Sequence, residues 1–319
     1  MVDRVDYDEM GLFHENAQEF GLPYDGPPTV RREAVEVEPE RRVSALVWGS
    51  AEPELVLLHG GSQNAHTWDT VAMALARPLV AIDLPGHGHS DGPRGGTESQ
   101  FRVAGLAADV AVAVRALAPR ARAVVGMSMG GLTTIALTQA APDLVRRAVL
   151  VDVTPGVSPR KAKQITDFVS GPATFASFDE ILARTIEFNP TRSVSSLRRG
   201  ILHNAEQQED GSWVWRYARH RPPAGSAAPV AGTDGGATPA AATADAAMFG
   251  ELWDAVSAIT VPIMLVRGML PQSVVDDDDE AELLRRQPTA RIEHIENAGH
   301  SVQGDTPVEL ARLIEDFAS

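Results

Sequence analysis

The sequence predicts an α/β protein with a mostly parallel sheet covered by helices on both faces. Five short, nearly continuous apolar runs each end in a turn: "ELVLLHG", "PLVAIDLPG", "RAVVGMS", "RAVLVDV" and "VPIMLVRG". Strands that are buried on both faces have this composition. Helical segments such as "FRVAGLAADVAVAVRAL" lie between several of the runs, and this alternation is typical of parallel strands joined by crossover helices.

The remaining elements complete an eight-stranded sheet. Residues 1–29 form an acidic N-terminal arm, after which alternation in "VRREAVEVEP" and "VSALVWG" predicts two antiparallel, half-exposed strands. The five apolar runs follow, and "ARIEHIE" and "PVELARLIEDFAS" supply a last strand and a last helix. We assign residues 30–156 and 257–319 to this core.

A long insertion interrupts the core after its sixth strand. Roughly a hundred residues separate Thr154 from Ser257, which is too long for a loop. Helix-like pieces such as "SFDEILARTIEF" predict a mainly helical lid over the carboxyl edge of the sheet, at residues 157–256. Within it, residues 222–247 are low in complexity and are predicted to form a flexible loop.

Composition excludes several classes of function. The net charge of −15 argues against nucleic acid or an anionic membrane surface as a partner. The chain has no cysteine, which excludes disulfides, thiolate zinc sites and cysteine nucleophiles. It shows no signal-peptide pattern and no apolar run of about 18 residues, so we expect a cytoplasmic protein. Whether it forms a homo-oligomer is left open.

The stretch "RAVVGMSMGGLTTIAL" places Ser128 between an apolar run and a segment rich in helix formers. Gly126 and Gly130 are its second neighbours, which matches G-x-S-x-G in the context that gives the motif meaning. Glycines there relieve crowding, so that a tight strand-to-helix turn can hold the serine in a strained, exposed position. Ser128 is therefore the candidate nucleophile.

A serine hydroxyl needs a base, usually a histidine that a carboxylate orients. His300, in "ENAGHSV", follows the last predicted strand and precedes the last predicted helix. It therefore lies on a loop at the same edge of the sheet as Ser128. The other histidines fall in a predicted strand, other loops, the arm or the insertion, and His300 is the best candidate base.

Four motifs occur in a familiar order: "LLHGGSQNAHTWDTV", "DLPGHGHSDG", "GMSMGG" and "NAGHSV". With them the chain resembles the α/β-hydrolase fold family from Leu57 to the C-terminus, apart from the lid. The resemblance implies a serine hydrolase that needs no cofactor, with the N–H groups of Gly61 and Met129 as its oxyanion hole. Such donors stabilise a developing oxyanion more than a ground-state carbonyl.

The acid departs from the commonest family pattern, in which a carboxylate follows strand 7. Pro271 stands at that place, and no carboxylate appears until Asp276. A minority of the family, including some lactone hydrolases, take the acid from the end of strand 6, where "VLVDVTPG" ends with Asp152. We favour Asp152. The alternatives are the run Asp276 to Asp279, more simply read as the start of a solvated helix, or no functional acid.

A second motif suggests a metal but is explained otherwise. His87, His89 and Asp91 in "HGHSD" match the start of the metal motif of metallo-β-lactamase-like lactonases, yet Gly92 stands where a histidine should follow. The hydrolase resemblance explains the same letters as the loop after strand 4. We expect no metal, and no nicotinamide or flavin cofactor.

Aromatic residues supply candidates for substrate contact. Trp213 and Trp215 alternate within the insertion, and Trp68 follows the oxyanion loop closely. We predict these three as substrate-binding residues for a flat or hydrophobic small molecule. Their alternative role is packing inside the lid or the core.

The expected reaction is hydrolysis of a carboxylic ester or lactone through an acyl-enzyme on Ser128. An acid on strand 6 together with a large lid resembles zearalenone-type macrolactone hydrolases, which favours a lactone. Fold does not determine substrate, and two alternatives use the same triad: C–C bond hydrolysis of a diketone and cofactor-free perhydrolysis. A small-molecule receptor without turnover is the alternative from another class.

Overall fold

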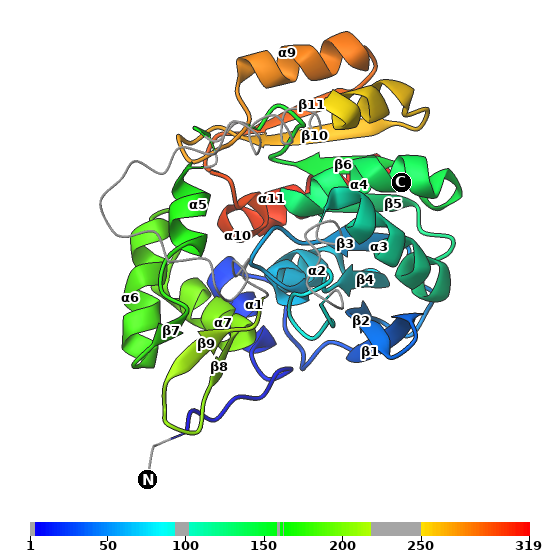
Figure 1. Cartoon of the computed structure of the whole chain (residues 1–319). Helices are drawn as coiled ribbons and strands as arrows, with labels where there is room; N and C mark the ends of the chain where they lie inside the picture. The colour runs from blue at the N-terminus through cyan, green and yellow to red at the C-terminus, as the bar shows by residue number, and fades with distance from the viewer. Residues whose placement is uncertain (1–3, 93–101, 158–159, 162, 218–249) are drawn as a thin grey trace.

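An eight-stranded sheet forms the centre of the molecule (Figure 1). The structure is a computed structural model that describes residues 4–92, 102–157, 160–161, 163–217 and 250–319. The strands are β1 (Val30–Glu38), β2 (Arg41–Trp48), β3 (Leu55–Leu58), β4 (Leu79–Ile82), β5 (Ala123–Met127), β6 (Ala148–Val151), β10 (Ile263–Gly268) and β11 (Arg291–Ile295).

The strand order is β1-β2-β4-β3-β5-β6-β10-β11. β2 pairs antiparallel with both β1 and β4, and every later pairing is parallel. The carboxyl ends of the parallel strands therefore meet at one edge, where ligands bind in open α/β sheets. The predicted eight-stranded, mostly parallel sheet is confirmed.

Helices cover both faces of the sheet, as predicted. One face carries α3 (Val103–Leu117), α4 (Met129–Ala140), α9 (Asp277–Arg286) and a helix at residues 250–258; the other carries α1 (Phe13–Phe20), α2 (Asp69–Leu75), α10 (Val302–Asp305) and α11 (Pro307–Ala318). Along β3, Val56 and Leu58 join the first apolar cluster, whereas Leu55 and Leu57 join the second. The nearly continuous apolar runs are thus explained by burial on both sides. No helix in the described ranges could span a bilayer.

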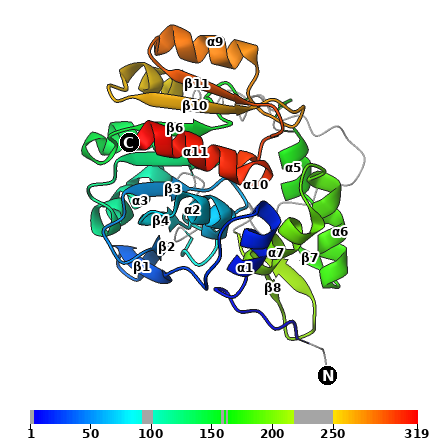
Figure 2. The same cartoon turned by 180° about the vertical axis from the view of Figure 1, so that it is seen from behind.

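The N-terminal arm contains a helix that the sequence analysis did not predict. In α1, Phe13 is 1% exposed and packs edge-on against Trp48, with ring centroids 5.1 Å apart. The helix lies beside α2 and beside α7 (Val194–Asn204) of the insertion (Figure 2). Arg199 of α7 donates to the Asn16 side chain at 3.0 Å. A single buried aromatic in an acidic stretch is a poor helix signal, because tertiary packing supplies most of the stability of a short helix.

The insertion between β6 and β10 is helical but also contains a small sheet. Besides α7 it holds α5 (Lys163–Val169) and α6 (Phe178–Phe188), and β7 (Thr174–Phe175), β8 (Ala205–Gln207) and β9 (Trp213–Trp215) form an antiparallel sheet in the order β7-β9-β8. Strands of two or three residues are too short to show alternation. These elements stand to one side of the core in both views.

The end of the insertion packs with the core. Leu252 and Val256, on the helix at residues 250–258, belong to the apolar cluster on the α3 and α4 face. The boundary expected at residue 257 therefore falls inside a helix that covers the sheet. The loop expected at residues 222–247 lies outside the described residues.

Glycines allow α4 to approach the sheet closely after β5. A Cβ atom on Gly126 would lie 2.2 Å from the carbonyl oxygen of Gly130, and a Cβ on Gly130 would lie 2.3 Å from the carbonyl oxygen of Leu58. Both contacts are with backbone, which cannot move aside as the end of a side chain can. The predicted need for small residues around Ser128 is confirmed.

We expect Gly130→Ala to lower the free energy of unfolding by about 1–3 kcal/mol or more, because the new methyl group forces α4 away from β3. Urea unfolding measures the change. Gly200→Ala is the matched control: Gly200 lies in α7 with nothing near the added carbon, so it should raise stability by about 0.5–1 kcal/mol. Equal stability of Gly130→Ala and the unaltered protein would contradict this packing.

Candidate active site

The turn between β5 and α4 holds Ser128 in a strained conformation, with φ 50° and ψ −120°. Its N–H donates to the carbonyl of Val151 at 3.2 Å, and its carbonyl accepts from Gly131 at 2.8 Å and Leu132 at 3.0 Å. A non-glycine residue persists at such a φ only where its surroundings enforce it. The backbone contacts do so here and keep Ser128 at the carboxyl edge of the sheet.

A histidine and a carboxylate meet beside this turn. His300 Nδ1 lies 2.8 Å from Asp152 Oδ2, although the two residues are 148 positions apart in the chain. Asp152 directly follows β6, and His300 lies between β11 and α10. The contact leaves His300 Nε2 available to a reacting group, which is the orientation a serine hydrolase needs.

Asp152 is buried, at 0% exposure, and its carboxylate is fully engaged. Its oxygens accept from the N–H of Gly268 at 3.0 Å, the hydroxyl of Ser273 at 2.6 Å and the N–H of Val274 at 3.1 Å, in addition to His300. These donors occupy both carboxylate oxygens and fix the orientation of the side chain. Asp152 can therefore orient His300 and stabilise the imidazolium that forms when His300 takes a proton.

The alternative acids have other partners. Asp276 and Asp279 form a capping box at the start of α9. Both also form ion pairs with Lys161, at 2.7 and 2.6 Å. Asp277 pairs with Arg267 at 2.8 Å. These contacts account for the acidic run as a helix start, and the geometry pairs His300 with Asp152 instead.

The loop after β3 is held beside Ser128 from several directions. The side chain of Asn204 donates to the carbonyl of Ser62 at 2.7 Å, and Gln63 Oε1 accepts from the N–H of Gly60 at 3.1 Å. The neighbouring residue, Gly61, lines the same cavity as Ser128 and Met129. Gly61 and Met129 remain the predicted oxyanion donors, since the Gly60 N–H is already used by Gln63.

A cavity of about 300 Å³ joins these groups. Ser128 and His300 line it from the core, and the insertion contributes apolar side chains that include Phe168, Leu197 and Trp215. The insertion therefore gives the cavity an apolar wall. Ligand pockets of about 300–1,000 Å³ lined in this way are typical of small-molecule sites.

Two of the three predicted aromatic contacts are wrong. Trp68 is 0% exposed and packs in the apolar cluster beneath α2, and Trp213 is buried inside the small sheet against Phe178. Neither lines the cavity, because apolar burial in the core and the insertion takes up both rings. Trp215 does line it and stacks on Tyr217, with ring centroids 5.6 Å apart.

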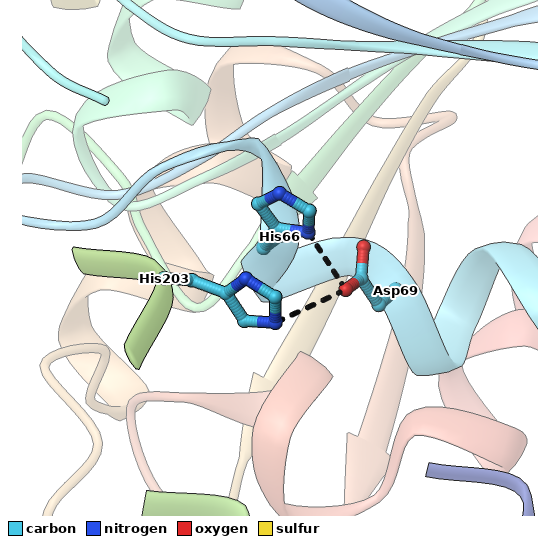
Figure 3. A group of neighbouring side chains, drawn as sticks. All are labelled: His66, Asp69 and His203. Carbon is cyan, nitrogen blue, oxygen red and sulfur yellow. Dashed lines mark hydrogen bonds and ion pairs between the residues drawn. The ribbon is translucent and has the colours of Figure 1, made fainter. Parts of the chain in front are cut away.

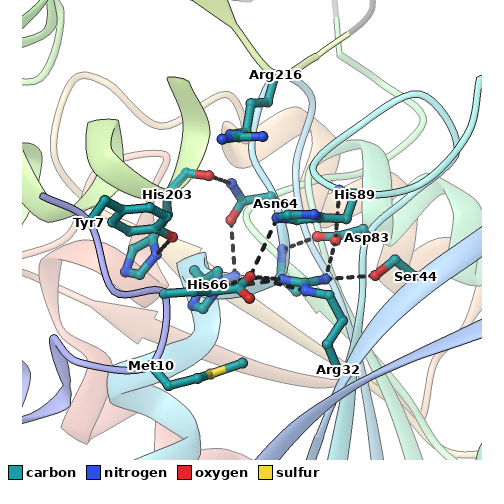
Figure 4. Close-up of polar contacts among 12 residues, drawn as sticks. Tyr7, Met10, Arg32, Ser44, Asn64, His66, Asp83, His89, His203 and Arg216 are labelled. Carbon is teal, nitrogen blue, oxygen red and sulfur yellow. Dashed lines mark hydrogen bonds and ion pairs between the residues drawn. The ribbon is translucent and has the colours of Figure 1, made fainter. Parts of the chain in front are cut away.

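A partly buried polar network ties the arm, β1 and the oxyanion loop together (Figure 4). Arg32 on β1 contacts Glu9 of the arm and donates to Asp83 at 2.7 Å. Asp83 in turn accepts from the N–H of Ala65 at 2.7 Å, in the short helix η1 (Ala65–Trp68). Buried charges that are paired and hydrogen-bonded in this way position the segments that carry them.

Three residues beside this network could be considered as metal ligands: His66, Asp69 and His203, which Figure 3 shows close together. Asp69 Oδ2 lies 2.9 Å from His66 Nδ1 and 3.8 Å from His203 Nε2. The two imidazoles are stacked, with centroids 3.8 Å apart and planes at 9°. An imidazole binds a metal through a lone pair in its ring plane, so two stacked rings cannot direct their lone pairs at one ion.

Charge also disfavours a ligand role for His66. Burial opposes its protonation, but the carboxylates of Asp69 and Glu9 outweigh burial and raise the pKa of His66 to about 9. A protonated imidazole has no lone pair to give. Burial lowers the pKa of His203, so a charged ring stacks on a neutral one. The three side chains therefore form a polar cluster whose charge depends on the proton of His66, and they do not form a metal site.

The residues of the "HGHSD" motif do not converge either. His87 stacks toward Tyr217, with ring centroids 6.3 Å apart. His89 Nε2 lies 3.4 Å from Glu9, whereas Asp91 accepts from the backbone N–H of Arg42 at 2.8 Å. The three side chains therefore have separate partners.

Sequence reasoning missed the residues that brace the oxyanion loop. Gln63 and Asn64 lie within the motif that follows the oxyanion glycine, so their position could have identified them. Asn204 carries no such signal, because it lies at the end of α7 and meets Ser62 and Asn64 only through folding.

Residues 55–313 match the profile of the Alpha/beta hydrolase family. The chain belongs to this family. Over 315 residues it is 42% identical to Esterase Rv0045c of Mycobacterium tuberculosis, a similarity that covers 96% of this chain and 94% of that protein. A solved structure of that esterase, reported with its transition metal inhibition, has a TM-score of 0.78 at 40% identity and covers 98% and 99% of the two chains.

A more distant relative within the family is 2-(acetamidomethylene)succinate hydrolase of Mesorhizobium japonicum. It is 25% identical over 272 residues, which is 83% of this chain and 87% of that one. The family resemblance seen in the sequence motifs is thus confirmed over most of the chain.

We expect Asp152→Asn to lower turnover by about 10³- to 10⁴-fold while the protein stays folded, because an amide cannot stabilise the imidazolium or enforce its productive tautomer. Steady-state kinetics with an ester substrate measures this. Asp276→Asn is the control and should stay within a few-fold of the unaltered protein. If Asp276→Asn loses activity and Asp152→Asn keeps it, the acid would be assigned to Asp276, after strand 7.

Stability should depend on pH through His66. The folded pKa of about 9 lies above the ordinary value of 6.5, so its contribution is complete below pH 6.5 and is lost as pH rises through 9. Between pH 6.5 and pH 9, the free energy of unfolding measured in urea should fall by up to about 3 kcal/mol more for the unaltered protein than for His66→Gln. Exposed His14 supplies the control, His14→Gln, which should keep the original slope. An identical slope in His66→Gln would refute the assignment.

Proposed function

We propose that this chain is a serine hydrolase that cleaves carboxylic esters, lactones included, through an acyl-enzyme on Ser128. The observation that carries the proposal is the contact of His300 with buried Asp152 at the edge of the cavity that Ser128 lines. The esterase name of the 42% identical relative supports the same class of substrate.

In the first half of the reaction, Ser128 Oγ attacks the carbonyl carbon as His300 Nε2 takes its proton. Asp152 stabilises the resulting imidazolium through Nδ1. The N–H groups of Gly61 and Met129 bind the oxyanion, where the helix dipole of α4 adds to their effect. His300 then returns the proton to the leaving alcohol as the tetrahedral intermediate collapses.

Water resolves the acyl-enzyme in the second half. His300 removes a proton from water, the hydroxide attacks the acyl carbon, and the proton passes to Ser128 as the carboxylic acid leaves. The same groups serve both halves, so the cycle requires no cofactor. Each step uses donors that are positioned before the substrate arrives, which is how such sites lower the barrier.

The cavity favours a substrate of modest size. Its volume of about 300 Å³ lies at the lower end of the range for ligand sites, and Phe168 and Trp215 supply an apolar wall. We propose esters with short to medium acyl chains as the first choice. A macrolactone such as zearalenone, suggested by an acid on strand 6, is the larger alternative.

Ser128→Ala and His300→Ala should each remove most ester turnover, because the two residues act in chemistry and act as a unit. A fluorophosphonate probe should label the unaltered protein at Ser128 and should not label Ser128→Ala, as mass spectrometry of the labelled peptide would report. Retention of turnover within a few-fold in either variant would refute the triad, and absence of labelling would favour a receptor without turnover.

A panel of esters, zearalenone, vinylogous 1,5-diketones and peroxide with acetate separates the reactions available to one triad. Hydrolysis of the simple esters or of zearalenone, at rates above those with the diketones and with peroxide, supports the proposal, and the faster of these two substrates decides between a short ester and a macrolactone. Turnover confined to the diketones would instead assign C–C bond hydrolysis, and turnover confined to peroxide would assign perhydrolysis.

A further inference from the structure

A cationic side chain from the insertion faces the cavity without a carboxylate partner. Arg192 lies in the turn between α6 and α7 and lines the same cavity as Ser128 and His300. It directly precedes Ser193, whose hydroxyl caps α7. The proposed reaction at Ser128 uses no contact of Arg192.

The guanidinium packs against the segment that carries the base. A Cβ atom on Gly304 would lie 2.8 Å from Arg192 Cζ and 2.9 Å from its Nε. Gly304 belongs to α10, four residues after His300. The missing side chain therefore leaves the space that the guanidinium occupies, close to the catalytic loop.

Few protein groups satisfy this guanidinium. Nη2 donates to the hydroxyl of Ser196, whereas Nε is buried and lacks a hydrogen-bond partner. Asp305 and Glu19 are the nearby acids. The oxygens of Asp305 accept from the hydroxyl of Thr191 at 2.9 Å and the N–H of Gly299 at 2.8 Å, and Glu19 pairs with Arg199. Among the residues that the structure describes, no acid forms an ion pair with Arg192.

The other cations of the cavity differ in this respect. Arg199 pairs with Glu15 and Glu19, and Lys161 pairs with the two acids at the start of α9. Arg192 is thus the cation whose compensation is incomplete. Burial lowers its pKa, with the like charge of Arg199 as a further cause, yet an arginine stays protonated at any physiological pH.

Arg192 is half-buried, and a guanidinium that is partly desolvated and lacks an acid partner costs free energy that a bound anion recovers. A guanidinium presents its N–H groups in a planar fork that matches a carboxylate. The net charge of −15 repels anions at long range, so selection of an anionic ligand has to come from a local cation of this kind.

We propose that Arg192 binds a carboxylate on the substrate, so that the preferred substrates are esters carrying a free carboxylate, such as monoesters of dicarboxylic acids. This inference rests on the proposed ester hydrolysis and names its substrate class. The carboxylate pairs with Arg192 while the ester carbonyl lies at Ser128, and the apolar wall of the cavity packs against the chain between them.

The test compares monoethyl adipate with ethyl hexanoate, which has the same chain length but no charge. In the unaltered protein kcat/KM should be higher for the monoester. In Arg192→Gln the ratio of the two kcat/KM values should fall by about 10- to 100-fold, as expected for loss of a charge-assisted hydrogen bond. Arg192→Lys, which keeps the charge but not the fork, should fall in between.

Two further variants separate binding from folding. Arg198→Gln removes an exposed arginine of α7 that pairs with Glu15, and it should keep the ratio of the unaltered protein. Gly304→Ala keeps Arg192 but places a methyl group against its guanidinium, and it should lower the ratio. If Arg192→Gln does not fold, Arg192→Lys and Gly304→Ala carry the test. The proposal is overturned if folded Arg192→Gln keeps the ratio of the unaltered protein. If Arg192→Gln does not fold, the proposal is overturned when both Arg192→Lys and Gly304→Ala keep that ratio.

A readout without turnover distinguishes this failure from failure of the proposed function. Adipate, the product of the monoester, should raise the melting temperature of Ser128→Ala and should not raise that of Ser128→Ala with Arg192→Gln. Adipate binding without ester turnover would overturn ester hydrolysis and retain the anion site. Ester turnover with the same adipate effect in both variants would retain hydrolysis and overturn the anion site.

Discussion

The buried carboxylate of Asp152 is the interaction on which the rest of the site depends. At 0% exposure it accepts hydrogen bonds from the end of β10, from the segment at Ser273 and Val274, and from His300. These donors come from segments that are remote in sequence from β6. One charged group thus sets the ends of two neighbouring strands and the loop of the base against each other, in a place where water cannot compete.

The nucleophile is positioned by a different constraint, the close approach of backbone to backbone around Gly126 and Gly130. Because α4 begins immediately after Ser128 and packs on β3 through these glycines, the serine is held at a φ of 50° and cannot relax into the helix. Packing supplies the strain here, while hydrogen bonds supply the alignment of His300. The two halves of the site therefore respond to different kinds of substitution.

The insertion does more than cover the sheet. It braces the oxyanion loop through Asn204, supplies the apolar wall at Phe168 and Trp215, and brings Arg192 against α10. The arm adds Glu9 to the partly buried network that reaches the oxyanion loop through Arg32 and Asp83. A protein of net charge −15 thereby surrounds its cavity with several buried or half-buried cations, whose charges count more there than at the surface because they are poorly solvated.

The sequence by itself determined the strands of the sheet, the turn at Ser128 and the loop that carries His300, because each depends on residues within a few positions of one another. Apolar runs specify strands buried on both faces, and Gly126 and Gly130 specify the turn at Ser128. Sequence and family resemblance together favoured Asp152, but its contact with His300 at 2.8 Å required the strand order to be known. Folding alone decided that Trp68 and Trp213 are buried, that the arm forms α1, and that Arg192 faces the cavity. These outcomes depend on which remote segments exclude water from a side chain, and local sequence does not encode that burial.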